Sequence, residues 1–228
     1  MLGLPDSTEI KKQLPKTLLT KKFGLKPEYR RLIDENVSRL DLINQISPKT
    51  IPALAEGEKV KSIFLLQVTL KKRNYASKAI TLIAKLIPQN LILLLSYDGE
   101  SQLAVFHEKL LTSSWRQNKS WNDDASIMIY GADLDRVWLS LKSQISGILL
   151  PEGKELTEQV FLEELHTKEE RDRLKKKIAQ LQRARKTEVQ PRRKFELHNE
   201  IQQLKKQLSR GNQNDQTGKI GSDHMQYR

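Results

Sequence analysis

Cysteine is missing from this sequence of 228 residues, and aromatic residues make up only 6% of it. Without cysteine the chain can form no disulfide, no thiolate zinc site and no cysteine nucleophile, which suits a reducing compartment such as the cytoplasm. The most apolar run, residues 90–96, is far shorter than the roughly 20 residues that a membrane-spanning helix needs. The first residues also lack a basic start followed by an apolar run, so we expect neither a signal peptide nor a membrane protein.

Positive charge is what the sequence has in excess. The sequence has 40 Lys and Arg residues against 28 Asp and Glu, which gives a net charge of +12. The positive charge is densest in residues 173–194, where Glu188 is the single acid. Such density attracts a phosphate backbone or an acidic protein surface, although a solvated helix face that only keeps the protein soluble would have the same pattern. The candidate residues for binding nucleic acid or a protein partner are Lys175, Lys176, Lys177, Arg183, Arg185, Lys186, Arg192, Arg193 and Lys194.

Hydrophobic periodicity predicts an α/β (α+β) domain over residues 1–150, with a small mixed sheet and flanking helices. The early prolines allow only short helices at the start, one of them capped near Asp6. Asp98-Gly99 predicts a tight hairpin turn between two strands. Strands are expected at 37–46, 59–71, 91–95 and 102–107, with weaker patterns at 110–115 and 127–130, and helices at 27–33, 76–87 and 134–148.

From residue 154 onward the apolar residues thin to a narrow stripe, which is typical of two amphipathic helices. Thr167 and Glu170 have the spacing of a capping box, and Pro191 interrupts the pattern. We therefore predict a C-terminal antiparallel helical hairpin, a short coiled coil, over 154–210, and a disordered polar tail over 211–228. The residues of the two seams are Leu174, Ile178 and Leu181, then Leu197, Ile201, Leu204 and Leu208.

No complete catalytic or metal-binding signature occurs in the sequence, so no catalytic site and no metal site is predicted. One weak constellation combines Asp41 on one predicted strand with Gln67, Thr69 and Lys71 on the next. Its order of elements resembles the large phosphodiesterase nuclease fold, in which acidic groups hold Mg²⁺ and a lysine helps to position the water. The second carboxylate is missing, because Gln67 and Thr69 stand where an acid is expected. A Mg²⁺-dependent nuclease is therefore the alternative hypothesis. The simpler explanation is that Lys71 only ends a strand and has no catalytic role.

Several short passages follow one another along the chain up to about residue 210: Leu2-Gly3-Leu4-Pro5, Ser7-Thr8-Glu9, Leu14-Pro15-Lys16, Ile87-Pro88 leading into Leu91–Leu95, Tyr97-Asp98-Gly99, Gln102-Leu103, Arg192-Arg193-Lys194, and Glu196-Leu197 with Asn199. In their order and spacing these passages resemble a bacterial family known only as domain of unknown function 4391. The resemblance implies no activity and no site residue. It does imply a setting, because members of that family accompany helicases and DNA methyltransferases in gene clusters that resemble restriction or antiphage systems.

Together these features favour a cytoplasmic, non-catalytic accessory or adaptor subunit of a bacterial DNA-defence complex, working without a cofactor. Its basic hairpin would contact a protein partner, a helicase or methyltransferase, or a nucleic-acid backbone without sequence specificity. Two other hypotheses stay open: the metal-dependent nuclease and a simple nonspecific DNA binder.

Overall fold

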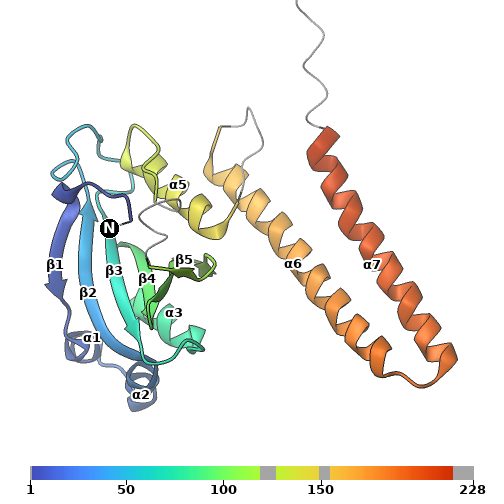
Figure 1. Cartoon of the computed structure of the whole chain (residues 1–228). Helices are drawn as coiled ribbons and strands as arrows, with labels where there is room; N and C mark the ends of the chain where they lie inside the picture. Colours follow the sequence, from blue (N-terminus) through green and yellow to red (C-terminus); the bar gives the residue numbers. More distant parts are fainter. Residues whose placement is uncertain (1, 119–126, 149–154, 218–228) are drawn as a thin grey trace, which may run out of the picture. The chain divides into compact units, whose positions relative to one another are not determined.

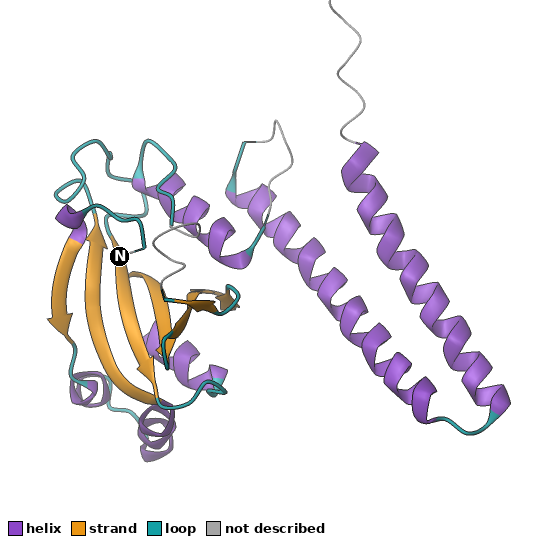
Figure 2. Cartoon of the chain, viewed as in Figure 1, coloured by secondary structure: helices purple, strands orange, loops and turns teal. Residues whose placement is uncertain are grey.

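The computed structural model describes residues 2–118, 127–148 and 155–217 (Figure 1). The chain divides into two compact units, Met1–Leu149 and Leu150–Arg228, which we call the α/β unit and the hairpin unit. Strands occur in the first unit, and the second is helical (Figure 2). The fold class predicted from the sequence, a mixed sheet with flanking helices followed by C-terminal helices, is confirmed.

Seven strands and a set of helices follow one another along the described residues. The strands are β1 (Glu9–Gln13), β2 (Val37–Ile46), β3 (Ile63–Leu70), β4 (Asn90–Tyr97), β5 (Glu100–His107), β6 (Lys109–Thr112) and β7 (Arg116–Gln117). The helices are the 3-10 helix η1 (Asp6–Thr8), then α1 (Lys16–Lys22), α2 (Pro27–Asn36), α3 (Ser77–Leu86), α5 (Leu134–Ser146), α6 (Glu158–Thr187) and α7 (Pro191–Thr217).

The sheet has the strand order β1-β2-β3-β4-β5-β6, and β7 pairs with β5. All neighbouring strands are antiparallel except β3 and β4, which run parallel. The crossover between these two strands contains α3. A parallel pair needs such a crossover because the chain must return to the same end of the sheet.

The alternation of β3 separates the two faces of the sheet. Leu66, Val68 and Leu70 lie in an apolar cluster with residues of α1, α2 and α3, among them Ile33 and Ile80. Residues 91–95 of β4 are all buried, which explains their continuous apolar run. The helix α5 contacts β5 and β6. The core therefore forms around the centre of the sheet.

The turn between β4 and β5 is built from the predicted Asp98-Gly99 pair. Both residues have positive φ angles, 44° for Asp98 and 77° for Gly99. A two-residue turn of this kind needs left-handed backbone at both central positions, which glycine and aspartate adopt more readily than other residues. The hairpin that the sequence predicts at this point is confirmed.

Asp135, in the first turn of α5, ties the loop before β3 to this helix. Its carboxylate accepts N–H hydrogen bonds from Glu58 at 2.6 Å and from Val60 at 2.8 Å. Burial alone would raise the pKa of Asp135, but the hydrogen bonds from Val60, Lys59 and Glu58 outweigh it, so the pKa lies below its ordinary value. Gly57 is required beside it, because a Cβ there would lie 2.5 Å from the carboxylate oxygen Oδ1.

In the hairpin unit, α6 and α7 are joined by residues 188–190 and pack against each other (Figure 1). Pro191 is the first residue of α7, a position where its missing N–H costs nothing. The seam between the helices has a small buried cluster of Ile178, Ile201 and Leu204, flanked by half-buried Leu174, Leu181 and Leu208. Six of the seven seam residues that the sequence predicts belong to this cluster, and the seventh, Leu197, is buried at 6% exposure.

Two details of the hairpin prediction are wrong. The first helix begins at Glu158, where the Thr157 hydroxyl accepts the N–H of Val160 at 3.2 Å. Thr167 is therefore not a cap but an interior residue, and its hydroxyl donates to the Glu163 carbonyl. The second helix continues to Thr217, so residues 211–217 of the predicted tail are helical, and 218–228 lie outside the described residues.

One strand prediction and one helix prediction in the α/β unit also need correction. Residues 127–130 form no strand, because the side chain of Gln144 takes the place of a neighbouring strand by bonding both the N–H and the carbonyl of Met128. Near the start of the chain only the short η1 forms at Asp6, and the next residues form β1, an edge strand paired with β2.

Candidate functional site

The strand constellation of the nuclease alternative is partly brought together. Asp41 lies directly opposite Gln67 in the pairing of β2 with β3, and Arg39 lies opposite Thr69. Asp41, Gln67 and Thr69 therefore share one face of the sheet. Lys71 follows the last residue of β3, and its side chain is exposed.

The chemistry of this face differs from that of a Mg²⁺ site. The Asp41 carboxylate forms an ion pair with Arg39 at 2.7 Å, and Gln67 donates to the Ser96 hydroxyl at 3.3 Å. Within residues 2–118, 127–148 and 155–217, no group of three or more His, Cys, Asp or Glu side chains could hold a metal ion. A neutral amide and a hydroxyl do not supply the charge that a Mg²⁺ ion requires.

The nine predicted basic residues of the hairpin divide into two groups. Four are held within the unit: Lys177 pairs with Glu200 at 3.1 Å, the Arg185 guanidinium lies 2.8 Å from His198 Nδ1, and Arg192 and Arg193 both pair with Glu196. The hydrogen bond with Glu196 raises the pKa of Arg193 above its ordinary value. These four residues stabilise the hairpin as well as contributing positive charge.

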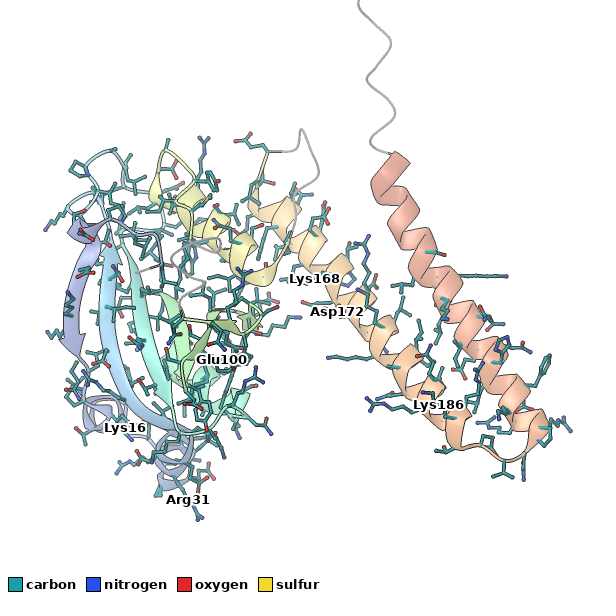
Figure 3. All side chains as sticks on the ribbon, viewed as in Figure 1. Lys16, Arg31, Glu100, Lys168, Asp172 and Lys186 are labelled. Atoms are coloured by element: carbon teal, nitrogen blue, oxygen red, sulfur yellow. The ribbon has the colours of Figure 1, made fainter. Side chains whose placement is uncertain are left out.

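The other five basic residues point into solvent. No hydrogen bond or ion pair to another described residue is made by the side chains of Lys175, Lys176, Arg183, Lys186 and Lys194. Lys186 lies close to the connection between α6 and α7 (Figure 3). These five side chains are therefore the ones free to neutralise a ligand, since binding would break no existing contact.

Two apolar side chains near the hairpin connection were missed by the sequence reasoning. Val189, in the connection itself, is 88% exposed, and Phe195, in the second turn of α7, is 66% exposed. A sequence signal for Phe195 exists, because it stands outside the seam spacing of Leu197, Ile201 and Leu204 and directly follows three basic residues.

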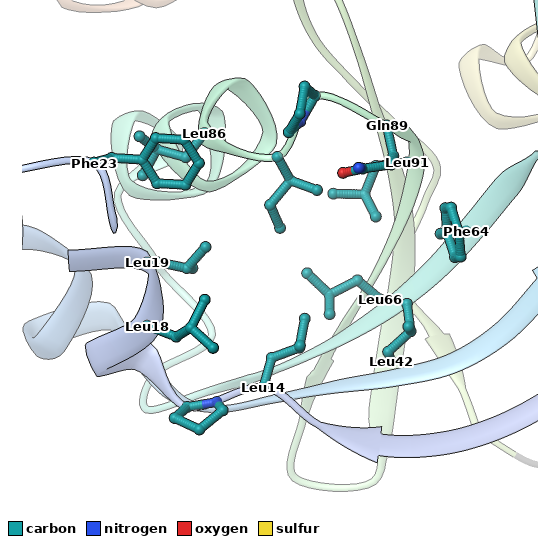
Figure 4. Close-up of a pocket in the computed structure, with 13 residues that line it drawn as sticks. Leu14, Leu18, Leu19, Phe23, Leu42, Phe64, Leu66, Leu86, Gln89 and Leu91 are labelled. Carbon is teal, nitrogen blue, oxygen red and sulfur yellow. The ribbon is translucent and has the colours of Figure 1, made fainter. Parts of the chain in front are cut away.

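An apolar pocket of about 280 Å³ opens in the α/β unit between α1, the sheet and the end of α3 (Figure 4). Leu18 and Phe23 come from α1 and the turn after it, and both are exposed. No pattern in the sequence predicts this pocket, because its lining residues come from separate segments of the chain. Its lining residues are Leu14, Pro15, Leu18, Leu19, Phe23, Leu42, Phe64, Leu66, Leu86, Ile87, Pro88, Gln89 and Leu91.

Aromatic and basic residues also meet at the end of the sheet where β3 finishes. The Arg73 guanidinium lies 5.2 Å from the centre of the Trp115 ring, and Tyr75 meets the same ring edge-on at 6.5 Å. Burial raises the pKa of Tyr75, partly offset by a hydrogen bond that its hydroxyl accepts from Gln102 at 2.6 Å. Because Arg73 also pairs with Glu100, its charge is already balanced.

Comparison with known protein families identifies a match over most of the chain. The model of a family described as a domain of unknown function (DUF4391) matches residues 2–208. No curated protein and no solved structure matches the chain. Among the helices of the described residues, none has both the length and the apolar character needed to cross a membrane.

Proposed function

The chain belongs to the family described as a domain of unknown function (DUF4391), and from this premise we propose that it is a cytoplasmic, non-catalytic accessory subunit of a bacterial DNA-defence complex. In this proposal the α/β unit is the body of the protein. The hairpin unit binds the backbone of a nucleic acid beside a protein partner, a helicase or a methyltransferase. The partner and the defence setting come from the gene clusters in which members of the resembled family occur.

The observation that supports the proposal is the group of five exposed basic side chains without an intramolecular partner. Four of them, Lys175, Lys176, Arg183 and Lys186, lie on α6 within three turns of one another. Lysine and arginine side chains at such spacing follow a phosphate backbone, and binding is driven by the release of condensed counterions. This mode requires no sequence readout and no catalytic group.

Charge neutralisation tests the nucleic-acid contact. Glutamine at Lys175, Lys176, Arg183 and Lys186 removes four charges but keeps a polar, unbranched side chain and a similar helix propensity. We expect the affinity of the full-length protein for duplex DNA to fall at least tenfold, and the slope of log K against log salt to lose about one unit for each phosphate contact removed. Fluorescence anisotropy over a salt series measures both quantities.

The matched control removes the same number of charges from the α/β unit. Lys12, Lys26, Lys49 and Lys72 are exposed, and their side chains make no hydrogen bond or ion pair to another described residue. Changing these four to glutamine should leave the salt slope as it is in the wild type. An equal loss in both variants would mean that net charge alone, and not the hairpin, attracts the DNA.

Co-elution tests the protein partner. A mixture of the full-length protein with the helicase or methyltransferase encoded beside its gene should elute as one complex in gel filtration at low salt. Separate elution of each candidate partner under these conditions would count against an accessory subunit. A nonspecific DNA binder would then remain.

The second candidate function is a Mg²⁺-dependent nuclease, and the placement of Asp41 opposite Gln67 is the observation in its favour. Asp41, Gln67, Thr69 and Lys71 would then surround the metal and the attacking water. A plasmid-cleavage assay with Mg²⁺ or Mn²⁺ separates the two functions. Cleavage by the wild type that is lost in Lys71→Ala would favour the nuclease, and no cleavage by either protein would remove it.

A further inference from the structure

Phe195 is a large apolar side chain that does not belong to the apolar cluster between α6 and α7. It precedes the seam residue Leu197 by two positions, which turns it about 200° around the helix. Leu197 is 6% exposed whereas Phe195 is 66% exposed. Phe195 is thus not an incompletely packed member of the seam but a side chain on the outer face of α7.

Positive charge surrounds this phenylalanine. Lys194 precedes it and is exposed without an intramolecular partner, and Arg192 lies one turn away on the same face. Arg192 and Arg193 share the single carboxylate of Glu196, at 3.6 and 2.9 Å, so one positive charge of this trio is left unbalanced. The carboxylate of the nearby Glu188 accepts hydrogen bonds from the N–H groups of Val189 and Gln190, in the connection between the two helices.

Polar side chains continue the outer face away from the connection. Asn199, Gln202 and Lys206 follow Phe195 at intervals of three or four residues, and all three are exposed. Residues at such intervals lie above one another on a helix. Amides can bond the edges of bases, and a lysine can bond a phosphate.

We propose that the outer face of α7, from Arg192 to Lys206, binds single-stranded nucleic acid, with the ring of Phe195 stacked on an unpaired base. This inference rests on the proposed function and names its substrate class. The basic side chains around the ring bind the phosphates on either side of the stacked base, a combination that single-strand-binding surfaces share.

The aromatic ring is what favours a single strand over a duplex. Backbone contacts to a duplex require only the cationic side chains, and a duplex offers an aromatic ring no base face without unstacking, which costs a few kcal/mol per step. An unpaired base exposes its face at no such cost. The charge around Phe195 also favours a polyanion over an apolar protein surface.

Alanine at Phe195 tests the stack in the full-length protein. Anisotropy is measured with a labelled oligothymidylate and with a duplex of equal length at one salt concentration. We expect the wild type to prefer the single strand, and Phe195→Ala to weaken single-strand binding roughly ten- to hundredfold, the effect of losing one base–aromatic stack. Duplex binding should be unchanged, and Phe195→Trp should retain single-strand binding.

Two controls separate stacking from apolar contact. Leu162→Ala removes a comparable exposed apolar side chain, 41% exposed, from α6 and should have no effect. Phe195→Leu keeps apolar area but no aromatic face, and should behave as Phe195→Ala does. Circular dichroism of each variant reports whether the helices remain, which is expected because alanine and leucine are good helix formers.

The outcomes distinguish this inference from the proposed function. Full single-strand binding by Phe195→Leu, equal losses on single strand and duplex, or a loss confined to a protein partner or to anionic vesicles would each overturn the stacking of Phe195. If the α6 glutamine variant loses DNA binding while Phe195→Ala keeps it, the proposed function stands and the inference fails. If neither variant changes DNA binding, both fail.

Discussion

The α/β unit and the hairpin unit are stabilised in different ways. In the α/β unit the central strand β4 buries every residue from Leu91 to Leu95, and helices contribute to the same apolar cluster. In the hairpin unit the seam cluster contains three buried residues, and ion pairs such as Lys177–Glu200 join the helices. The α/β unit therefore buries its apolar side chains in a core, whereas the hairpin unit leaves most of its side chains exposed and available to a ligand.

Truncation in the core of the α/β unit should have the largest effect. Leu93 is 0% exposed in the centre of the sheet. Leu93→Ala leaves a cavity that its neighbours cannot fill, so we expect a loss of about 2–5 kcal/mol in the free energy of unfolding. Urea denaturation followed by tryptophan fluorescence measures it, because all three tryptophans, at positions 115, 121 and 138, belong to this unit. A loss below about 1 kcal/mol would contradict this core placement.

Truncation in the seam should have a smaller and local effect. Ile201 is 2% exposed, but it has few buried neighbours. Ile201→Ala should cost the hairpin about 2 kcal/mol, the lower end for such a change, because a narrow seam relaxes more easily than a core. Hydrogen exchange followed by mass spectrometry should be faster in peptides from α6 and α7, with the tryptophan transition unchanged. Slower exchange, or a shifted tryptophan transition, would mean that the two units do not differ in this way.

The smallest effect is expected at Asp135, and it depends on pH. The folded pKa of this carboxyl is lowered, so its contribution is present above the ordinary value of 3.8 and is lost as pH falls through the folded pKa. Asp135→Asn should therefore cost about 1–2 kcal/mol at neutral pH, through weaker hydrogen bonds to the N–H groups, and little in acid. Urea denaturation of both proteins at two pH values measures the difference.

The control for this last prediction is Asp34→Asn. Asp34 pairs with Lys16 at 2.8 Å, but its side chain is 59% exposed. Surface pairs contribute about 0–1 kcal/mol, so this variant should differ little from the wild type at either pH. An equal cost at neutral and acid pH for Asp135→Asn would show that its charge is not what ties the loop to α5.

The elements that the sequence predicted best are those whose patterns depend on near neighbours. Alternation located β2 at its observed bounds, and the Asp98-Gly99 pair located the hairpin turn. The prediction failed where a distant residue decided the outcome. The strand expected at 127–130 is replaced by bonds from Gln144, which no local pattern reveals. The helix cap predicted at Thr167 is wrong for another reason, because the residue spacing of a capping box also occurs inside a helix.

The candidate site shows the same division. Composition alone located the basic segment, since charge density can be read from the chain. The sequence could not show which of the nine basic side chains already have a partner in the protein. Arg185, for example, meets His198 only when α7 folds back on α6. The position of Phe195, two residues before Leu197, indicates that the two side chains lie on opposite sides of the helix. This predicts an exposed Phe195 only once the structure shows that Leu197 faces the other helix.

The sequence by itself determined the two halves of this protein, one with enough apolar residues for a sheet core and one with a narrow apolar stripe and a surplus of cations. It did so because hydrophobic periodicity and charge are local properties of the chain. Only the tertiary structure decided which charges are already paired, which polar residues face Asp41, and which aromatic ring is left in water. Each of these depends on a contact between residues that the chain itself keeps apart.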